Sequence, residues 1–179
     1  TIRIVINPPP TSLPTLFTKP SLDIKVITEK VSPILEAVRR EGDAALRGFT
    51  EQFDGVAQQD LLVREAEFTT AIPQVSPELQ AAIRTAHANI RAFHAAQSQK
   101  VREIETMTGV RCWRKSLPIE KVGLYIPGGT APLFSTLLML GIPAKLAGCK
   151  EIVLCTPPQK DGSIHPAILF TAQLIGIRQ

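Results

Sequence analysis

Tyr125 is the residue whose type and position most clearly point to chemistry, because it is the only tyrosine of the 179-residue chain. It lies in a short apolar run, Val122–Ile126, that is typical of a buried strand, and Pro127-Gly128-Gly129 follows as a sharp loop. A tyrosine ring offers an apolar face and one directed hydrogen bond, and glycines let a planar group or a phosphate approach the backbone. The alternative is a core tyrosine whose hydroxyl has a partner within the fold. The pattern alone leaves both interpretations open.

The three histidines lack the spacing of a metal site. His87 and His94 lie seven residues apart on one predicted helix, which separates them by roughly 10 Å, too far to share an ion. His165 precedes Pro166 near a helix start, so we interpret it as a capping or solvated side chain. The sequence therefore predicts no metal ligand in this chain.

The other polar side chains that catalysis commonly uses also have structural interpretations. Two pairs of glutamates lie two residues apart, a spacing that we interpret as solvated edges rather than as acid–base pairs. They are Glu65 with Glu67 and Glu103 with Glu105. Ser135 and Thr136 stand at a predicted helix start and have no identifiable base, so capping is the expected role. No catalytic residue is predicted.

Composition and charge exclude several classes of protein. Apolar residues make up 44% of the chain, which is typical of a globular protein. The net charge of +4 comes from interleaved residues of both signs, without a basic run. One Trp and one Tyr are too few to form a surface on which bases stack. We therefore expect no nucleic-acid partner. No stretch is long and apolar enough for a membrane span, and no secretory leader is recognisable. Cys112, Cys149 and Cys155 form no Cys-x-x-Cys pair and are expected to be reduced, small and buried, in a cytoplasmic protein.

The elements that would position Tyr125 form a strand–helix–strand unit. We predict strands at Val122–Ile126 and Glu151–Cys155, and between them a buried helix, Ser135–Ala147, that Gly148 ends. Such strands lie parallel, and their continuous apolar runs indicate cover on both faces. Ligands of parallel sheets bind beyond the carboxyl ends of the strands, where Tyr125 and its loop lie.

The preceding sequence is mainly helical. Ile2, Ile4 and Ile6 alternate with other residues as in a short edge strand. A hairpin is predicted about the turn Met107-Thr108-Gly109. The predicted helices span Thr28–Glu41, a segment from Asp43 to Asp54, Glu65–Ile72, a long segment from Ser76-Pro77 to about Lys100, and Ser163–Ile175.

The predicted fold class is α/β: a helical amino-terminal segment and a hairpin leading into an incomplete Rossmann-like parallel sheet. A doubly wound sheet returns to a third parallel strand after a helix such as Ser163–Ile175, whereas this chain ends at Gln179. We therefore expect a chain cut within a domain, with an open sheet edge.

Several strings resemble the histidinol dehydrogenase family. The main ones are Leu124–Leu133, with the sequence Leu-Tyr-Ile-Pro-Gly-Gly-Thr-Ala-Pro-Leu, and Ile142–Cys149. Arg40–Leu46, Asn89–His94 and Gly109–Cys112 also fit, in the family's order. The resemblance covers nearly the whole chain except about the first twenty residues and corresponds to less than half of a usual family member.

The resemblance implies a cytoplasmic homodimer that oxidises L-histidinol to L-histidine with NAD and zinc, in histidine biosynthesis. It implies that Tyr125 belongs to the NAD site; whether Pro127, Gly128 and Gly129 touch the cofactor stays open. The zinc ligands and the acid–base pair belong to the family's carboxyl-terminal portion, so this chain by itself is expected to be inactive. The alternative is a stand-alone nucleotide-binding or dimerisation module. The implied domains are an arm at 1–20, a helical segment with a hairpin at 21–120, and the start of an NAD-binding domain at 121–179.

Overall fold

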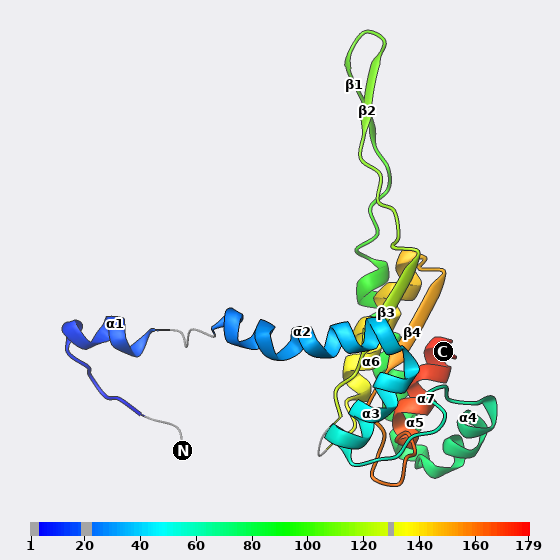
Figure 1. Ribbon diagram of the computed structural model, residues 1–179. Helices are drawn as coiled ribbons and strands as arrows, with labels where there is room; N and C mark the ends of the chain where they lie inside the picture. Colours follow the sequence, from blue (N-terminus) through cyan, green and yellow to red (C-terminus); the bar gives the residue numbers. More distant parts are fainter. Residues whose placement is uncertain (1–3, 19–22, 129–130) are drawn as a thin grey trace. The chain divides into compact units, whose positions relative to one another are not determined.

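The computed structural model describes residues 4–18, 23–128 and 131–179 (Figure 1). The chain divides into two compact units, Thr1–Gly42 and Asp43–Gln179. Each has its own elements, and the second contains both sheets. The class is mixed α/β, as the sequence predicted.

The first unit consists of a short 3₁₀ turn, η1 (Pro10–Ser12), a single helical turn, α1 (Leu13–Leu16), and the long helix α2 (Ile24–Glu41). The expected start of α2 at Thr28 is wrong. Asp23 caps the helix earlier, since its Oδ1 accepts a hydrogen bond of 3.0 Å from the Lys25 amide. Pro33 consequently lies in the helix interior, and Gly42, with φ of +59°, follows the last turn.

The edge strand expected near the amino terminus is also not found in the described part of the chain. Residues 1–3, and with them Ile2, lie outside the described residues. Ile4 and Ile6 are exposed and in no strand. Alternation alone does not make a strand, because the segment also needs a neighbouring strand to satisfy its backbone.

The second unit begins with α3 (Asp43–Asp54), α4 (Glu65–Ala71) with the 3₁₀ turn η2 (Ile72–Gln74), and α5 (Pro77–Ala95). Ser76 caps α5 as predicted, accepting from the Leu79 amide at 3.3 Å. The helix ends at Ala95, short of the expected Lys100, because the apolar repeat that packs it onto its neighbours stops at Ile90, and Phe93 is already exposed.

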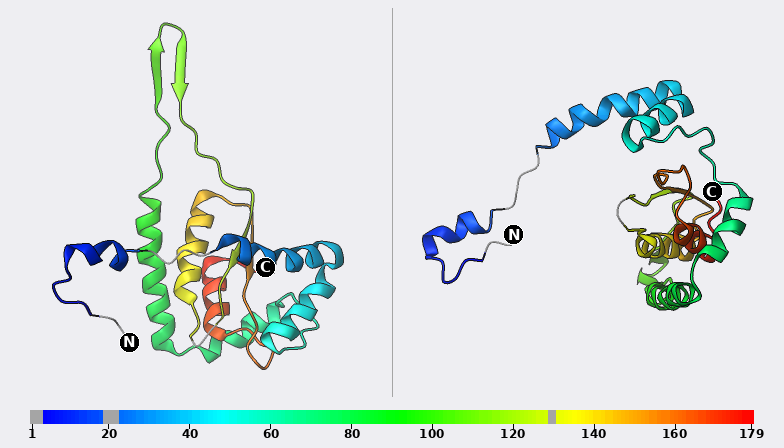
Figure 2. Two further views of the ribbon diagram at one scale, coloured as in Figure 1. Left: turned by 60° about the vertical axis from the view of Figure 1, so that its left-hand side comes forward. Right: turned by 90° about the horizontal axis from the view of Figure 1, so that it is seen from below.

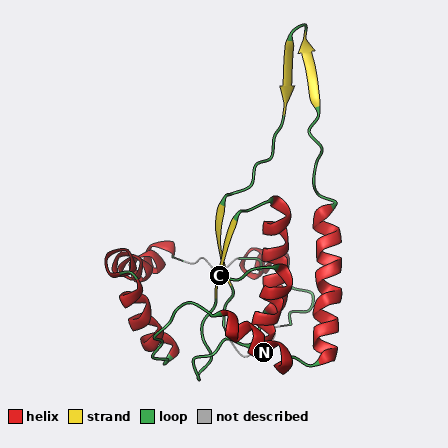
Figure 3. Cartoon of the chain, turned by 90° about the vertical axis from the view of Figure 1, so that its right-hand side faces the viewer, coloured by secondary structure: helices red, strands yellow, loops and turns green. Residues whose placement is uncertain are grey.

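After α5 the chain extends into a hairpin and returns (Figure 3). Strands β1 (Glu103–Met107) and β2 (Val110–Trp113) are antiparallel, with Glu103 opposite Trp113. Gly109 adopts φ of +83° at the turn, a conformation that favours glycine. All residues of both strands are exposed, so pairing and the turn hold the hairpin, not a core.

The strand–helix–strand prediction is confirmed. β3 (Lys121–Tyr125) and β4 (Glu151–Cys155) are parallel and pair residue by residue, from Lys121 with Glu151 to Tyr125 with Cys155. Helix α6 (Phe134–Ala147) connects them, and Gly148 ends it in the left-handed conformation at φ of +89°. Helix α7 (Pro166–Ile175) follows β4; it starts three residues later than predicted, where His165 and Pro166 provide the cap and first residue.

The expectation that this sheet is covered on both faces is wrong for the described chain. Side chains of Val122, Leu124, Ile152 and Leu154 join the core, whereas Gly123, Tyr125, Val153 and Cys155 on the other face are exposed. Helices α5, α6 and α7 lie side by side and pack together (Figure 2). Continuous apolar sequence thus did not distinguish a strand buried on one face from one buried on both.

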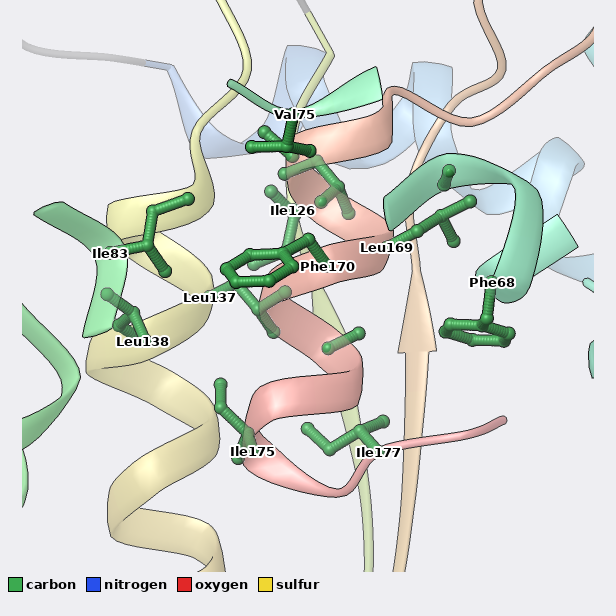
Figure 4. Packing of buried hydrophobic residues seen from close by; sticks show 14 of the residues in the cluster. Phe68, Val75, Ile83, Ile126, Leu137, Leu138, Leu169, Phe170, Ile175 and Ile177 are labelled. Carbon is green, nitrogen blue, oxygen red and sulfur yellow. The ribbon is translucent and has the colours of Figure 1, made fainter. Parts of the chain in front are cut away.

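The core of the second unit forms between α5, α6, α7 and the inner face of the sheet (Figure 4). Helix α7 is its centre: seven of its ten residues are buried. Its one buried hydroxyl, on Thr171, donates a 2.7 Å hydrogen bond to the Ala167 carbonyl within the helix. Gly141 of α6 faces Ile175 and Ile177, where a Cβ would meet Ile177 Cδ1 at 3.1 Å.

Beyond α7 the chain turns back to the sheet. Gly176, with φ of +80°, reverses the direction, Ile177 is buried, and the Leu154 amide donates a 2.8 Å hydrogen bond to the Gln179 carbonyl. The last residues therefore lie along the edge of β4 that β3 does not occupy, where a third strand was expected.

A substitution at Leu138 tests how much this core contributes to the stability of the fold. We expect Leu138→Ala, at a side chain with no exposed surface, to lower the free energy of unfolding by about 2–5 kcal/mol, because it leaves a cavity between α5 and α6. Leu140→Ala on the same helix is the matched control: its side chain is 40% exposed, so the loss is about 1 kcal/mol or less. Urea denaturation followed by circular dichroism measures both, and equal losses would contradict the packing of Leu138 between α5 and α6.

Candidate functional site

Tyr125 is the last residue of β3 and lies on the uncovered face of the sheet. Its side chain is 60% exposed, and within the described part of the chain its hydroxyl has no hydrogen-bond partner. The alternative of a core tyrosine with an internal partner is therefore not what this structure contains. Position and exposure are those that a ligand-facing ring requires; its contact with a cofactor stays a prediction.

The chain leaves the sheet immediately after Tyr125. The next residue, Ile126, is fully buried, and its amide donates a 2.9 Å hydrogen bond to the Cys155 carbonyl, which extends the ladder by one residue. Because successive side chains point to opposite faces, the burial of Ile126 fixes the orientation of Tyr125 toward the uncovered face. The buried side chain of Ile126 thus sets the position of Tyr125, the candidate binding residue.

Gly128 is required by a close contact inside the protein. A Cβ built there would lie 3.2 Å from Cγ and 3.3 Å from Cβ of Pro157, in the loop after β4. The sequence predicted that glycines here give a ligand access to the backbone, and for Gly128 the close neighbour is the protein's own proline. Gly129 and Thr130 lie outside the described residues. The contact holds the two loops at the carboxyl ends of β3 and β4 together.

A small apolar pocket of about 270 Å³ lies next to β4, at the edge along which the last residues of the chain run. Leu62, Phe68, Leu169 and Cys155 are among the residues that line it. Tyr125 does not line this pocket, so the structure does not bring the two together into one cavity.

Of the three histidines, the structure shows a structural role for His165. His165 caps α7, since its Nδ1 accepts a 3.1 Å hydrogen bond from the Ala167 amide, which confirms the predicted capping role. His94 Nδ1 lies 2.8 Å from Gln97 Oε1. Partial burial and the neighbouring Arg91 guanidinium lower the pKa of His87, which therefore carries less charge at neutral pH than a free histidine. Among described residues, no group of three or more His, Cys, Asp or Glu side chains is placed to hold a metal ion.

The paired glutamates are solvent-exposed, as predicted, and they make local contacts at the surface. Glu67 Oε1 accepts a 2.8 Å hydrogen bond from the Arg64 amide at the start of α4, and Glu65 lies 3.6 Å from Arg178. In the hairpin, Glu103 lies 3.6 Å from Arg111, and Glu105 accepts from the Gly109 amide at 2.9 Å. All these groups are at the surface.

Two expectations about small polar side chains are wrong. Ser135 and Thr136 do not cap α6, because the helix begins one residue earlier, at Phe134, and Leu133 occupies the capping position without a side-chain hydrogen bond. Cys112 and Cys155 are exposed rather than buried, the first on the bare hairpin and the second on the uncovered face of β4; only Cys149 is partly buried. All three thiols are free.

The described residues include no helix long and apolar enough to cross a membrane.

Comparison with known proteins now decides the family. The family model described as histidinol dehydrogenase matches residues 17–179. The chain belongs to the histidinol dehydrogenase family. The likeness includes the strand–loop unit that carries Tyr125, and it agrees with the resemblance found in the sequence motifs.

Individual family members agree closely. Histidinol dehydrogenase of Bacteroides thetaiotaomicron is 52% identical over 162 residues, which cover 90% of this chain and 38% of that protein. The enzyme of Xylella fastidiosa strain Temecula1 is also 52% identical over 162 residues. The crystal structure of histidinol dehydrogenase from Elizabethkingia anophelis matches with a TM-score of 0.88 and 49% identity, over 98% of this chain and 40% of that one. The chain thus spans about 38% of the length of the curated relatives it matches.

The contact between Gly128 and Pro157 can be tested by matched glycine substitutions. We expect Gly128→Ala to lower the free energy of unfolding by about 1 kcal/mol, because the proline ring has to move away from the new methyl group. Gly123→Ala, on the preceding strand β3, is the control: nothing lies within 4 Å of the added Cβ, so stability should stay the same or rise slightly. Thermal and urea unfolding measure both changes. If the two variants behave alike, the loop contact does not constrain Gly128.

Proposed function

We propose that this chain supplies the amino-terminal part of a histidinol dehydrogenase that oxidises L-histidinol to L-histidine in two steps, each reducing one NAD. Membership of the family supports the reaction. The observation that carries the role of this chain is the placement of Tyr125: an exposed aromatic side chain at the carboxyl end of a parallel strand, where α/β folds bind their cofactors.

The residues present fit one side of an NAD site. Tyr125 offers a ring face and a hydroxyl without an internal partner in the described chain, and Pro157 keeps the loops after β3 and β4 together beside it. When bound, NAD accepts the hydride that leaves the alcohol carbon. On this proposal the chain's own contribution is binding and orientation: the ring packs against a planar part of the cofactor, and the hydroxyl forms one directed hydrogen bond. Residues 121–179 then begin the cofactor-binding domain.

The described residues do not fit a zinc site, because they include no suitable cluster of ligands. No step of the reaction is therefore assigned to a metal held by this chain. On this proposal the zinc ligands and the proton-transfer groups come from sequence outside residues 1–179, and the chain alone binds cofactor or partner without turnover.

We also propose that the working enzyme is a homodimer in which α2 forms part of the interface. Ile24, Ile27, Val31 and Leu35 recur at helical spacing on one face of α2, and all four are exposed. None of the helix's residues is buried. An amphipathic helix gains most of its stability by packing its apolar stripe against a partner, and a second copy of the chain provides one.

Tyr125 is the direct test of the cofactor role. In the full-length enzyme, we expect Tyr125→Phe to weaken NAD binding by about 1 kcal/mol, up to roughly tenfold, because the ring stays while the hydrogen bond is lost. Tyr125→Ala should weaken it further and leave zinc content unchanged. Phe53→Ala removes a ring of nearly equal exposure, 61%, and serves as the control. Calorimetric titration with NAD measures the affinities; parental affinity in both Tyr125 variants would reject the role.

The interface proposal has an unusually close control. Ile27 lies on the stripe and is 45% exposed, and its neighbour Val26 lies off the stripe and is 47% exposed. We expect Ile27→Glu to weaken dimerisation by roughly 100-fold, because a carboxylate would be buried in the interface, and Val26→Glu to leave it unchanged. Sedimentation over a range of concentrations measures both. A dimer equally stable in the two variants would place the interface elsewhere.

A further inference from the structure

A hollow in the second unit lies far from Tyr125 along the sheet. It has a volume of about 1050 Å³, and it is lined by the end of α5, both extended segments that lead to the hairpin, and the last turn of α6. Because α6 starts after the carboxyl end of β3 and ends before the amino end of β4, its last turn lies at the amino ends of the strands. Tyr125 lies at the opposite, carboxyl end.

The base of the hairpin is held against α6. Pro118, which lines the hollow, lies close to Gly148, where an added Cβ would be 3.8 Å from the proline Cγ. The Lys150 amide also donates a 2.9 Å hydrogen bond to the Glu120 carbonyl, and their side chains form an ion pair at 3.3 Å. The returning segment is therefore anchored at Pro118 and Glu120, to the end of α6 and the loop after it.

The charge in this hollow has one sign. Lys100, Arg102 and Arg114 line it, and no aspartate or glutamate does among the described residues. Arg102 and Arg114 stand one residue beyond the last strand pair, Glu103 with Trp113, on the two segments that leave the hairpin. Like charges on facing segments repel each other unless a counter-charge lies between them.

The carboxylates nearby are already used. Glu103 pairs with Arg111 at 3.6 Å, and Glu105 accepts from the Gly109 amide. Lys100, Arg102 and Arg114 have no carboxylate within 4 Å in the part of the chain that the structure describes. Neutral polar side chains complete the lining and can bond the oxygens of an anion. They are Gln97, Ser98, Gln99 and Ser116.

We propose that this hollow binds a small polyanion of the phosphate type, with the Arg102 and Arg114 guanidinium groups as its principal ligands. A guanidinium presents paired N–H donors that match two oxygens of a phosphate, and two of them facing one space suit a diphosphate better than a single charge. The proposal is independent of the NAD site, because Tyr125 does not line the hollow.

Binding in this hollow can be followed by the fluorescence of a tryptophan of the chain. Trp113 is the only tryptophan of the chain, and it lines the hollow. Titration of the chain with sodium pyrophosphate at constant ionic strength should give a saturable change in tryptophan emission. The constant ionic strength separates binding from general screening of the basic chain.

Two double variants make the test specific. Arg102→Gln with Arg114→Gln should weaken pyrophosphate binding at least about tenfold. Arg39→Gln with Lys160→Gln removes the same charge from exposed positions outside the hollow and should leave the affinity unchanged. Circular dichroism confirms that both fold, and calorimetry under the same conditions detects binding that leaves the indole unaffected. The proposal is overturned if neither method shows saturable binding by the parent chain, or if both double variants weaken it equally.

Discussion

The one-sided cover of a two-stranded parallel sheet is the constraint on which the rest of the second unit depends. Parallel strands need a crossover, and α6 provides it on the same face that α7 covers. Helix α7 is apolar around most of its circumference, so it has to be enclosed by α4, α5, α6 and the sheet together. Once these helices occupy one face, the side chains that alternate to the other face, Tyr125 among them, are left facing outward.

That arrangement explains why the candidate site could be located from sequence and why its surroundings could not. Local signals drew attention to Tyr125: a single tyrosine, an apolar run before it and glycines after it; the resemblance to histidinol dehydrogenases then favoured the cofactor role over a core tyrosine. Glu151–Cys155 and the stop at Gly148 were predicted to the residue for the same reason, because apolar runs and glycine are local markers of strand and helix ends.

The wrong expectations concern properties that distant parts of the chain determine. Whether Cys155 is buried depends on which face the helices cover, and its own strand sequence is equally apolar in either case. The need for glycine at position 128 comes from Pro157, on the other strand's loop. Helix α2 shows the same limit: the helix was predicted from sequence, but nothing in the sequence indicated that its apolar face is exposed rather than packed. The basic hollow combines residues from α5, the hairpin segments and α6, and no single stretch reveals it.

The pairing of β3 with β4 also determines what an insertion in the connection between them would cost. Pairing of Lys121 with Glu151 closes a loop in which α6 is already ordered, so the entropy of closure depends mainly on the short connections at its two ends. That entropy rises only with the logarithm of loop length, so extra residues between β3 and α6 would cost the fold little. The connection nevertheless begins with Pro127 and with Gly128, which is in close contact with Pro157. Its compact start is therefore better explained by the close contact between Gly128 and Pro157 than by the entropy of closing the loop.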